Sequence, residues 1–441
     1  MLLAPNTLAA IADQLVATED GLRFAVVPVS ADPLAFVRAA APVFGSARYV
    51  ASPGGVRLGS VGTAWRAHAQ GLRRFERLEE AWRRGPEMPA AARLMLGFAF
   101  SPDGPRTDVW DGFAASELVL PEVTVIAEPP HVSYAVVAVP PGAEPRSVIA
   151  ALADLAQPVS PRVPGLGDHS VHAIPPGAEW CVAVEEAVAA IEAGSLRKVV
   201  LARSVAVDAE MTIDAFEMVH HLGVRNPQCH IYGWQVGDAT LIGASPELLV
   251  GTRDGEVRAN PLAGSAKRGI GDEEDRRIGA ALLSSEKDRV EHALVVEDIA
   301  SRLRPLTVTL DVPAEPSLSR AATVQHLSTQ IRGSMRNGTS LLGLAGQLHP
   351  TPAVGGTPRQ DAIAFIDKVE TIDRGWYSGG VGWLSPSGEG DVAVALRCAL
   401  VSGRHALLFA GNGIVADSNP QAELVETRWK LGPLLNLLTE A

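Results

Sequence analysis

The chain of 441 residues is long enough for one large domain or for two or three small ones. Its net charge of −12, without any block rich in lysine or arginine, argues against a nucleic-acid partner. No apolar run approaches the ~20 residues that a membrane-spanning helix needs, and the N-terminus lacks the features of a secretory signal, so we expect a cytoplasmic protein without a membrane partner. Cys181, Cys229 and Cys398 match neither a zinc pattern nor a disulfide framework, and we expect reduced core residues.

Residues 1–156 mix short strand-like runs with helical ones and show no chemical constellation, so we assign them a scaffold role. The predicted strands are Leu22–Val29, Leu58–Val61, Leu94–Phe100, Glu122–Ile126 and Tyr134–Val139. A helix is predicted over Ala64–Arg84, where Leu72, Phe75, Leu78 and Trp82 share one stripe. Residues 157–177, rich in Pro, Gly and Ser, form a connection. Residues 178–441 form the catalytic part, and we expect one compact unit with the N-terminal part.

The catalytic part opens with a predicted helix over Trp180–Ala193 and a buried strand over Lys198–Arg203. A lysine at the mouth of such a strand is most often an edge residue whose amine reaches water. The chemical alternative is a partly desolvated amine that acts as a base. Both readings of Lys198 stay open on the residues alone.

Further strands over Cys229–Val236 and Thr240–Ala244 lead to Glu247, whose backbone direction is fixed by the preceding proline. A surface turn acid is the ordinary reading of such a residue. A hairpin follows around Asp254-Gly255, and the small residues Gly264 and Ser265 permit close approach of a ligand to the backbone.

A helix is predicted over Ser285–Leu303, with a Ser-x-x-Asp start and Glu291 directed away from the core face that Val290, Leu294 and Ile299 supply. His326 lies in a strand predicted over Thr323–Arg332, and a histidine there is more often structural than a base. A proline-rich loop, His349–Pro358, precedes a helix near Arg359–Ile366. Three consecutive antiparallel strands are predicted over Trp376–Trp383, Asp391–Leu400 and Arg404–Ala410.

The stretch from Gly411 to Lys430 begins with a predicted glycine-rich turn and continues as a helix with Asn419 or Ser418 as N-cap and Pro420 at its first position. One helix face carries Glu423, Glu426 and Lys430, and the other carries Leu424, Val425 and Leu431. Two carboxylates and an ammonium beside free backbone N–H groups can hold a divalent metal and an anion together. The alternative is a solvated, salt-bridged helix.

Several blocks in this order resemble the chorismate-utilising enzymes, and among them most of all isochorismate synthase, from about Trp180 to the C-terminus. The blocks are Arg-Lys-Val-Val-Leu-Ala-Arg, Gly-Ala-Ser-Pro-Glu-Leu-Leu, Pro-Leu-Ala-Gly-Ser-Ala, Lys-Asp-Arg-Val-Glu-His, Val-Gln-His-Leu, His-Pro-Thr-Pro-Ala-Val, Trp-Tyr-Ser-Gly-Gly-Val-Gly, Leu-Arg-Cys-Ala and Glu-x-x-Glu-Thr-x-x-Lys. Each block is weak alone, and their shared order is specific.

The resemblance implies an α/β fold of the α+β type, in which two facing antiparallel-rich sheets are flanked by helices, and a requirement for Mg²⁺. It implies that Lys198 is the water-activating base and Glu247 the general acid. The implied metal site comprises Glu291, Glu426 and, nearby and through water, Glu423. The implied substrate-binding residues are Gly264, Ser265, His326, Ala353, Tyr377, Arg397, Gly411, Gly413 and Lys430. Asn412 departs from the pattern, because alanine is commoner between the two glycines.

The implied reaction explains these residue types. Attack of water at C2 of chorismate and loss of hydroxide from C4 need a base and an acid, each contributing roughly 10²–10⁴-fold. The lysine must then be neutral and the glutamate protonated. Mg²⁺ takes oxygen ligands and keeps some waters, so it suits two carboxylates and the ring carboxylate of the substrate.

Relatives remain as alternatives. In ammonia-using anthranilate and aminodeoxychorismate synthases, the position of Lys198 does not normally carry such a base, and no glutaminase subunit is expected here. Salicylate synthases, which share the lysine and then expel pyruvate, usually carry threonine at the position of Ala353, so isochorismate synthase comes first and salicylate synthase second. A non-catalytic protein that binds chorismate is the third reading. We expect a monomer or weak homodimer, and the product could feed menaquinone, siderophore or other secondary metabolism.

Overall fold

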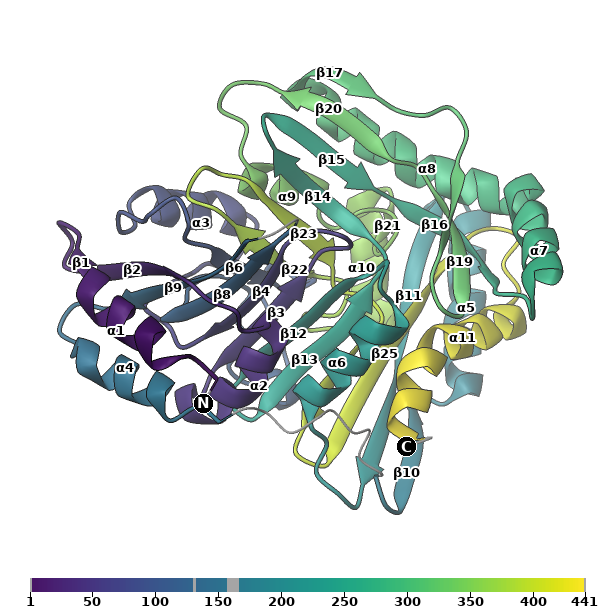
Figure 1. Cartoon of the computed structure of the whole chain (residues 1–441). Helices are drawn as coiled ribbons and strands as arrows, with labels where there is room; N and C mark the ends of the chain where they lie inside the picture. Colours follow the sequence, from purple (N-terminus) through teal and green to yellow (C-terminus); the bar gives the residue numbers. More distant parts are fainter. Residues whose placement is uncertain (1, 130–131, 157–165, 440–441) are drawn as a thin grey trace.

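The computed structural model describes residues 2–129, 132–156 and 166–439, and the strands within these ranges form three sheets (Figure 1). Two large antiparallel sheets face each other across a shared apolar core, and helices lie on their outer surfaces. The predicted fold class is therefore confirmed. No helix within these ranges combines the length and the apolar character that crossing a membrane requires.

The first sheet has thirteen strands within the described residues. In spatial order they are β1 (Val16–Ala17), β2 (Arg23–Pro28), β9 (Val132–Val139), β8 (Val123–Glu128), β4 (Arg57–Val61), β3 (Ala47–Ala51), β12 (His230–Val236), β13 (Ala239–Ser245), β24 (Cys398–Ser402), β25 (His405–Ile414), β11 (Lys198–Ala209) and β10 (His169–Ile174), with β21 (Gly356–Thr357) also paired to β11. Because β3 pairs with β12, strands from before and after the connection share one sheet.

The second sheet has nine strands within the same ranges, and a small third sheet has three. The second contains β17 (Thr307–Asp311), β20 (Ile331–Met335), β15 (Glu256–Asn260), β14 (Leu248–Arg253), β23 (Gly390–Val394), β22 (Gly380–Leu384), β6 (Leu94–Phe98), β7 (Ser116–Leu120) and β5 (Trp65–His68). The third contains β16 (Leu262–Lys267), β19 (Val324–Ser328) and β18 (Ser317–Arg320).

Helices cover the sheets in separate groups (Figure 1). The outer face of the first sheet carries α1 (Pro5–Gln14), α2 (Pro33–Phe44), α4 (Pro145–Ala153), α6 (Ala215–Arg225) and α11 (Pro420–Thr439). The second sheet is packed by α3 (Arg74–Arg83) and α9 (Leu341–Leu348), and the start of β11 by α5 (Gly177–Glu192) and α10 (Arg359–Val369). Beside the small sheet lie α7 (Asp272–Ser284) and α8 (Glu286–Leu303), and the short helices are η1 (Asp108–Trp110) and η2 (Arg304–Leu306).

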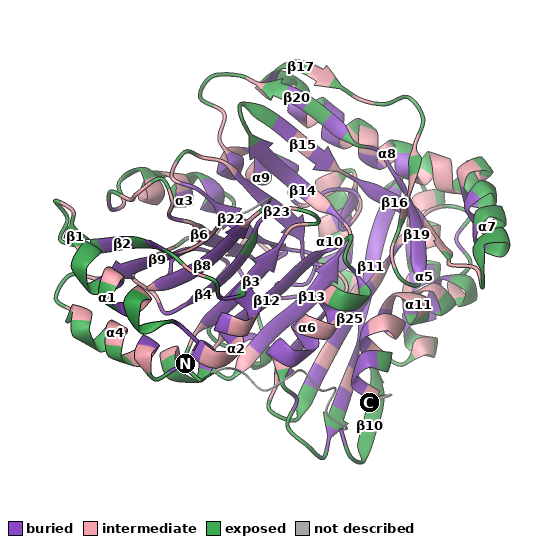
Figure 2. Ribbon diagram, in the orientation of Figure 1, coloured by how far each residue is buried: buried purple, intermediate pink, exposed green. Residues whose placement is uncertain are grey.

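The strands of the first sheet are apolar on both faces because both faces are covered. In β25, Ala406, Leu408 and Ala410 pack under the helices, whereas Phe409 points into the core between the sheets. Figure 2 shows the buried centre of this sheet and the exposed edge strand β10. Cys181, Cys229 and Cys398 are buried and unpaired, as predicted.

Two of the points at which the chain crosses between the two large sheets lie next to each other. From β13 to β14 it passes through Pro246 and Glu247, and from β23 to β24 it passes through Ala395 to Arg397. The crossings are tied together by two backbone hydrogen bonds, from Val394 N to Glu247 O (3.1 Å) and from Ala244 N to Arg397 O (3.2 Å). Arg397 has φ of 50°, a conformation that costs a non-glycine residue about 1–3 kcal/mol and is common at functional sites.

Many predicted elements are confirmed. Ser285 caps α8 by accepting a hydrogen bond from Asp288 N, and Asn419 caps α11 by accepting from Gln421 N and Ala422 N. The β14–β15 hairpin turns at Asp254-Gly255, both in the left-handed region. Two predicted core contacts are wrong, because Val290 and Val425 are 56% and 39% exposed.

The predicted helix over Ala64–Arg84 is wrong in its first half. Trp65–His68 forms β5 and the helix α3 begins only at Arg74, so Leu72 lies outside the helix and is 91% exposed. Alternating burial along β5 and a left-handed Gly71 (φ 81°) explain the difference.

Several strand boundaries are also corrected. Thr323–Arg332 is two strands, β19 and β20, in different sheets, and Asp391–Leu400 is likewise split into β23 and β24. The strand predicted over Trp376–Trp383 starts only at Gly380. The predicted connection over 157–177 contains β10, while 157–165 lie outside the described residues.

A buried ion pair between Glu370 and Arg374 binds the backbone of β11 near its start. The side chains of Glu370, just after α10, and Arg374 are each 4% exposed and bond through two contacts of 2.5 and 2.8 Å. Glu370 Oε1 also accepts from Ala202 N (2.7 Å), and Arg374 donates to Val200 O (2.7 Å) and Val354 O (2.8 Å). The pair therefore joins β11 to the loop that precedes α10.

Substituting Glu370→Gln is expected to lower the free energy of unfolding by about 3–5 kcal/mol, because it leaves a buried guanidinium without a countercharge. Urea denaturation measures this loss. The matched control is Asp367→Asn on α10, which breaks an exposed pair with Arg106 and should cost about 0–1 kcal/mol. Equal losses in the two variants would contradict the expectation.

Candidate active site

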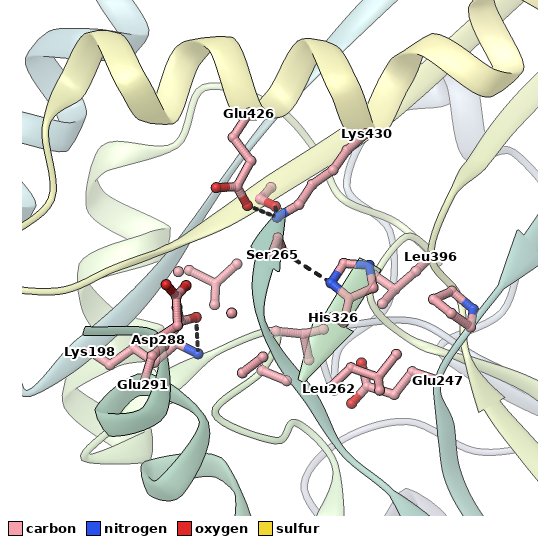
Figure 3. A pocket seen from close by; sticks show the side chains of 18 of the residues that line it. Lys198, Glu247, Leu262, Ser265, Asp288, Glu291, His326, Leu396, Glu426 and Lys430 are labelled. Carbon is pink, nitrogen blue, oxygen red and sulfur yellow. Dashed lines mark hydrogen bonds and ion pairs between the residues drawn. The ribbon is translucent and has the colours of Figure 1, made fainter. Parts of the chain in front are cut away.

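One pocket lies where the two crossings meet β11, β25, β16, α8 and α11 (Figure 3). Every predicted site residue lines it: Lys198, Glu247, Gly264, Ser265, Glu291, His326, Ala353, Tyr377, Arg397, Gly411, Gly413, Glu423, Glu426 and Lys430. The structure thus gathers residues that are widely separated along the chain.

Lys198 reaches the pocket because of strand periodicity. Val199 and Leu201 pack into the core under α5 and α10, so Lys198 and Val200 point to the opposite face of β11 and line the pocket. Lys198 is 1% exposed, and its Nζ lies 2.9 Å from Glu291 Oε1 on α8. It is therefore not an edge residue whose amine reaches water.

Glu247 lies on the opposite side of the pocket from Lys198 (Figure 3). It is 3% exposed, and burial raises the pKa of its carboxyl to about 8, although Lys198, the N–H of Leu262 and Arg397 each act to lower it. The carboxyl therefore holds its proton at neutral pH and can donate it.

A polar relay joins Arg397, His326 and Ser265. Arg397 Nη2 donates to His326 Nε2 (3.0 Å), so the ring proton is on Nδ1, which lies 3.0 Å from Ser265 Oγ. Burial, followed by Arg397 and Lys430, places the pKa of His326 well below its usual range. His326 is thus a neutral residue that orients its two neighbours.

Tyr377 and Gly411 form another part of the wall. The Tyr377 ring stacks on Phe409 with 5.2 Å between centroids, and burial raises the pKa of its phenol to about 12, so the hydroxyl stays protonated. A Cβ on Gly411 would lie 2.9 Å from that hydroxyl. Ala353 lines the pocket from the loop between α9 and β21.

Gly411 and Gly413 belong to β25, so the predicted glycine turn is wrong. They pair with Ala202 and Val200, whose N–H groups bond to Glu370 and Gly355 on the other side of β11. In an antiparallel pair, two directly opposed residues either bond to each other or both turn their N–H and C=O groups away from each other. Because Ala202 and Val200 turn theirs away from β25, the N–H groups of both glycines point away from β11. The predicted free N–H groups thus arise from a strand.

Gly413→Ala is expected to lower turnover about tenfold or more with little loss of stability. Its Cβ would lie 2.4 Å from Glu291 Oε1 and 2.6 Å from Lys198 Cε, and these flexible side-chain ends would move aside. Turnover at saturating substrate measures the effect on activity, and the melting temperature measures the effect on stability. Gly432→Ala on α11, where a Cβ meets nothing within 4 Å, is the control; unchanged turnover in Gly413→Ala would contradict the expectation.

Four carboxylates gather between α8 and α11, namely Asp288, Glu291, Glu423 and Glu426. Burial raises the pKa of both Asp288 and Glu423, and Glu426 raises it further in each case. Two lysines offset part of this negative charge, because Lys430 Nζ lies 2.7 Å from Glu426 and Lys287 Nζ lies 3.3 Å from Glu423. Lys198 Nζ lies 2.9 Å from Glu291.

This cluster fits a divalent cation that uses few protein ligands. Across residues 2–129, 132–156 and 166–439, no group of three or more His, Cys, Asp or Glu side chains is arranged to hold a metal by itself. Mg²⁺ commonly binds through one or two carboxylates and completes its shell with water and substrate. A cation between the carboxylates would reduce the repulsion among them. Glu291 and Glu426 are the carboxylates that face the pocket from the two helices and could bind it.

Comparison with known proteins decides the family. The family model described as "Chorismate binding enzyme" matches residues 12–439. The chain belongs to the chorismate binding enzymes. It is 40% identical over 392 residues to the salicylate biosynthesis isochorismate synthase of Pseudomonas aeruginosa, covering 86% of this chain and 82% of the relative.

Two further comparisons agree. The chain is 35% identical over 352 residues to the isochorismate synthase MenF of Bacillus subtilis, covering 78% and 74% of the two chains. The solved menaquinone-specific isochorismate synthase of Escherichia coli superposes with a TM-score of 0.83 at 29% identity, covering 98% of each chain. The resemblance to isochorismate synthase is confirmed, and within the chorismate binding enzymes the chain is of this isomerase type.

Sequence reasoning missed two charged residues of this chorismate binding enzyme. Lys287 and Asp288 line the pocket, but from the sequence Asp288 was assigned only to the helix start and Lys287 only to a spacing of four residues from Glu291. Their position one turn before Glu291 was the available signal, because residues three and four apart share a helix face.

Proposed function

We propose that this enzyme converts chorismate to isochorismate by adding water at C2 and expelling the C4 hydroxyl. The observation that carries the proposal is the placement of a buried amine, Lys198, and a protonated carboxyl, Glu247, on opposite sides of one pocket. The names of the relatives support the same reaction.

In this mechanism Lys198 takes a proton from the attacking water as its oxygen bonds to C2. The diene electrons shift around the ring, the bond from C4 to its oxygen breaks, and Glu247 gives its proton to the departing hydroxide. Water is consumed and released, so the reaction is an isomerisation. Each proton transfer contributes roughly 10²–10⁴-fold.

The two carboxylates of chorismate need cationic or N–H partners. Arg397, with its guanidinium buried beside His326, and the N–H groups of Gly411 and Gly413 are suited to one of them. Ser265 and the Tyr377 hydroxyl supply further donors along the same wall, and the Lys430 ammonium adds positive charge there. These contacts orient the ring so that C2 faces Lys198 and C4 faces Glu247.

Glu291 and Glu426 would hold a Mg²⁺ ion, with Glu423 supporting it from behind. When bound, the ion neutralises the ring carboxylate of the substrate against the acidic helices. Glu423 is already held by Ser418 (2.8 Å), Asn412 (2.9 Å) and Lys287, which favours a supporting role.

Incubating the purified protein with chorismate and Mg²⁺ and separating the products by chromatography tests the proposal. Isochorismate without pyruvate or fluorescent salicylate is the expected result. Substantial salicylate with pyruvate would establish the salicylate synthase reading instead, and no turnover would favour the non-catalytic reading. The partner in each case is a small molecule.

Removing divalent metal with EDTA is expected to abolish turnover, and adding excess Mg²⁺ should restore it. The physical reason is that the ring carboxylate would otherwise face the carboxylates of α8 and α11 without a divalent cation between them. Calcium, which prefers more oxygen ligands at longer distances, serves as the comparison ion. Full activity after exhaustive chelation would remove the metal from the proposal.

A further inference from the structure

Asn412 lies behind the wall of the pocket that Gly411 and Gly413 form, on the face of β25 that packs against α11. It lies in β25 between Gly411 and Gly413, is 1% exposed, and directs its amide toward α11. Its Nδ2 donates to Glu423 O (2.8 Å) and to Glu423 Oε2 (2.9 Å), and its Oδ1 accepts from Lys430 Nζ (2.9 Å). One side chain thus bonds both to an acid and to an ammonium of the pocket.

Lys430 depends on this amide for its position. Its ammonium has three partners: Gly411 O (3.0 Å), Asn412 Oδ1 (2.9 Å) and Glu426 Oε1 (2.7 Å). Two of them belong to β25 and hold the ammonium against the strand, whereas the third is a carboxylate proposed to bind the metal. Without the Asn412 oxygen, the ammonium would be drawn toward Glu426 and away from the strand.

Glu423 depends on the same amide from the other side. Its Oε1 accepts from Ser418 Oγ (2.8 Å) and contacts Lys287, while Asn412 supplies the hydrogen bond to Oε2. Asn412 therefore fixes the rotation of this carboxylate about its long axis. Hydrogen bonds that include a charged group are among the stronger ones in proteins.

We propose that Asn412 is a positioning residue that holds Lys430 for the substrate and Glu423 for the cation at the same time. The inference rests on the proposed function, because it assigns these two side chains to chorismate and Mg²⁺. It predicts that loss of the amide weakens the binding of both chorismate and Mg²⁺. Loss of a hydrogen bond to Glu423 alone should weaken only the binding of Mg²⁺.

Three variants test the proposal: Asn412→Ala, Asn412→Val and Ser418→Ala. Alanine removes the amide, and valine removes it while filling space and favouring the strand. Ser418→Ala removes a hydrogen bond to Glu423 and leaves Lys430 untouched. KM and kcat for chorismate are measured, together with the Mg²⁺ concentration that gives half of the metal-induced rise in melting temperature.

Both Asn412 variants should raise the KM for chorismate and the Mg²⁺ midpoint about tenfold each, with kcat changed less. Ser418→Ala should raise the Mg²⁺ midpoint and leave KM within about twofold of the original. If both Asn412 variants keep KM and the midpoint within about twofold, or only lose melting temperature, Asn412 is merely structural and the proposal is overturned.

Failure of the proposed function is distinguishable. An unmodified protein that forms no isochorismate refutes the isomerase, while the Mg²⁺ midpoints still decide whether Asn412 organises a cation site. If Asn412→Ala fails to fold, the KM for chorismate and the Mg²⁺ midpoint measured in Asn412→Val decide the proposal. An equal rise of KM in Ser418→Ala would also overturn the proposal, because Lys430 would then not depend on Asn412 specifically.

Discussion

Replacing Lys198 by methionine should lower kcat by roughly 10²–10⁴-fold, the contribution expected of a general base. Methionine keeps the length of the side chain but cannot accept a proton. The amine is 1% exposed and contacts only the wall of the pocket and Glu291, so its loss removes the one basic nitrogen that faces the reaction from β11. Steady-state turnover of chorismate at saturating Mg²⁺ measures the effect.

Two comparisons make this result specific. Lys368→Met on α10 removes an exposed lysine and should leave kcat unchanged. Chorismate binding by Lys198→Met, followed as a shift in melting temperature, should persist, because the substrate carboxylates are assigned to Arg397, Lys430 and the glycines. A variant with near-normal kcat would remove Lys198 as the base.

The sequence predicted the composition of this site better than its backbone. Lys198, Glu291 and Glu426 were each identified from short ordered blocks, and strand and helix periodicity directs all three into one pocket. Such patterns involve residues close together in the sequence, so they can be recognised without knowing the tertiary structure. The same holds for the caps at Ser285 and Asn419.

The errors have a common physical cause, which is pairing between distant segments. Gly411 and Gly413 look like a turn locally, but they extend β25 because β11 pairs with them. The split of Asp391–Leu400 is likewise set by the second sheet, which the chain leaves at Arg397. Neither constraint is present in the residues nearby.

Asn412 shows what a departure from a family pattern can mean. The sequence indicated only that asparagine stands where alanine is commoner between the two glycines. In the structure its amide bonds to both Glu423 and Lys430, so the departure adds contacts to two side chains that line the pocket. A substitution next to two functional glycines is thus understood only through the helix that covers them.

The acid provides a second large effect with a defined pH dependence. Glu247→Gln should lower kcat/KM roughly 10²–10⁴-fold at pH 7, since an amide cannot protonate the departing hydroxide. Because burial raises the Glu247 pKa to about 8, the unmodified enzyme should lose kcat/KM as pH rises through about 8, where the carboxyl gives up its proton. Glu247→Gln should lack this alkaline limb, and Glu256→Gln on the exposed part of β15 should retain it.

The same carboxyl makes an independent prediction about stability. Its pKa is raised from 4.5 to about 8 in the folded protein, so the folded state holds a proton that the unfolded state releases between these values. The stability that it contributes is complete below pH 4.5 and is lost as pH rises through 8. Urea denaturation between pH 5 and 8 should therefore show a steeper loss in the unmodified protein than in Glu247→Gln. Parallel curves, or an alkaline limb that persists in Glu247→Gln, would show that another group carries the proton and that Glu247 is not the acid.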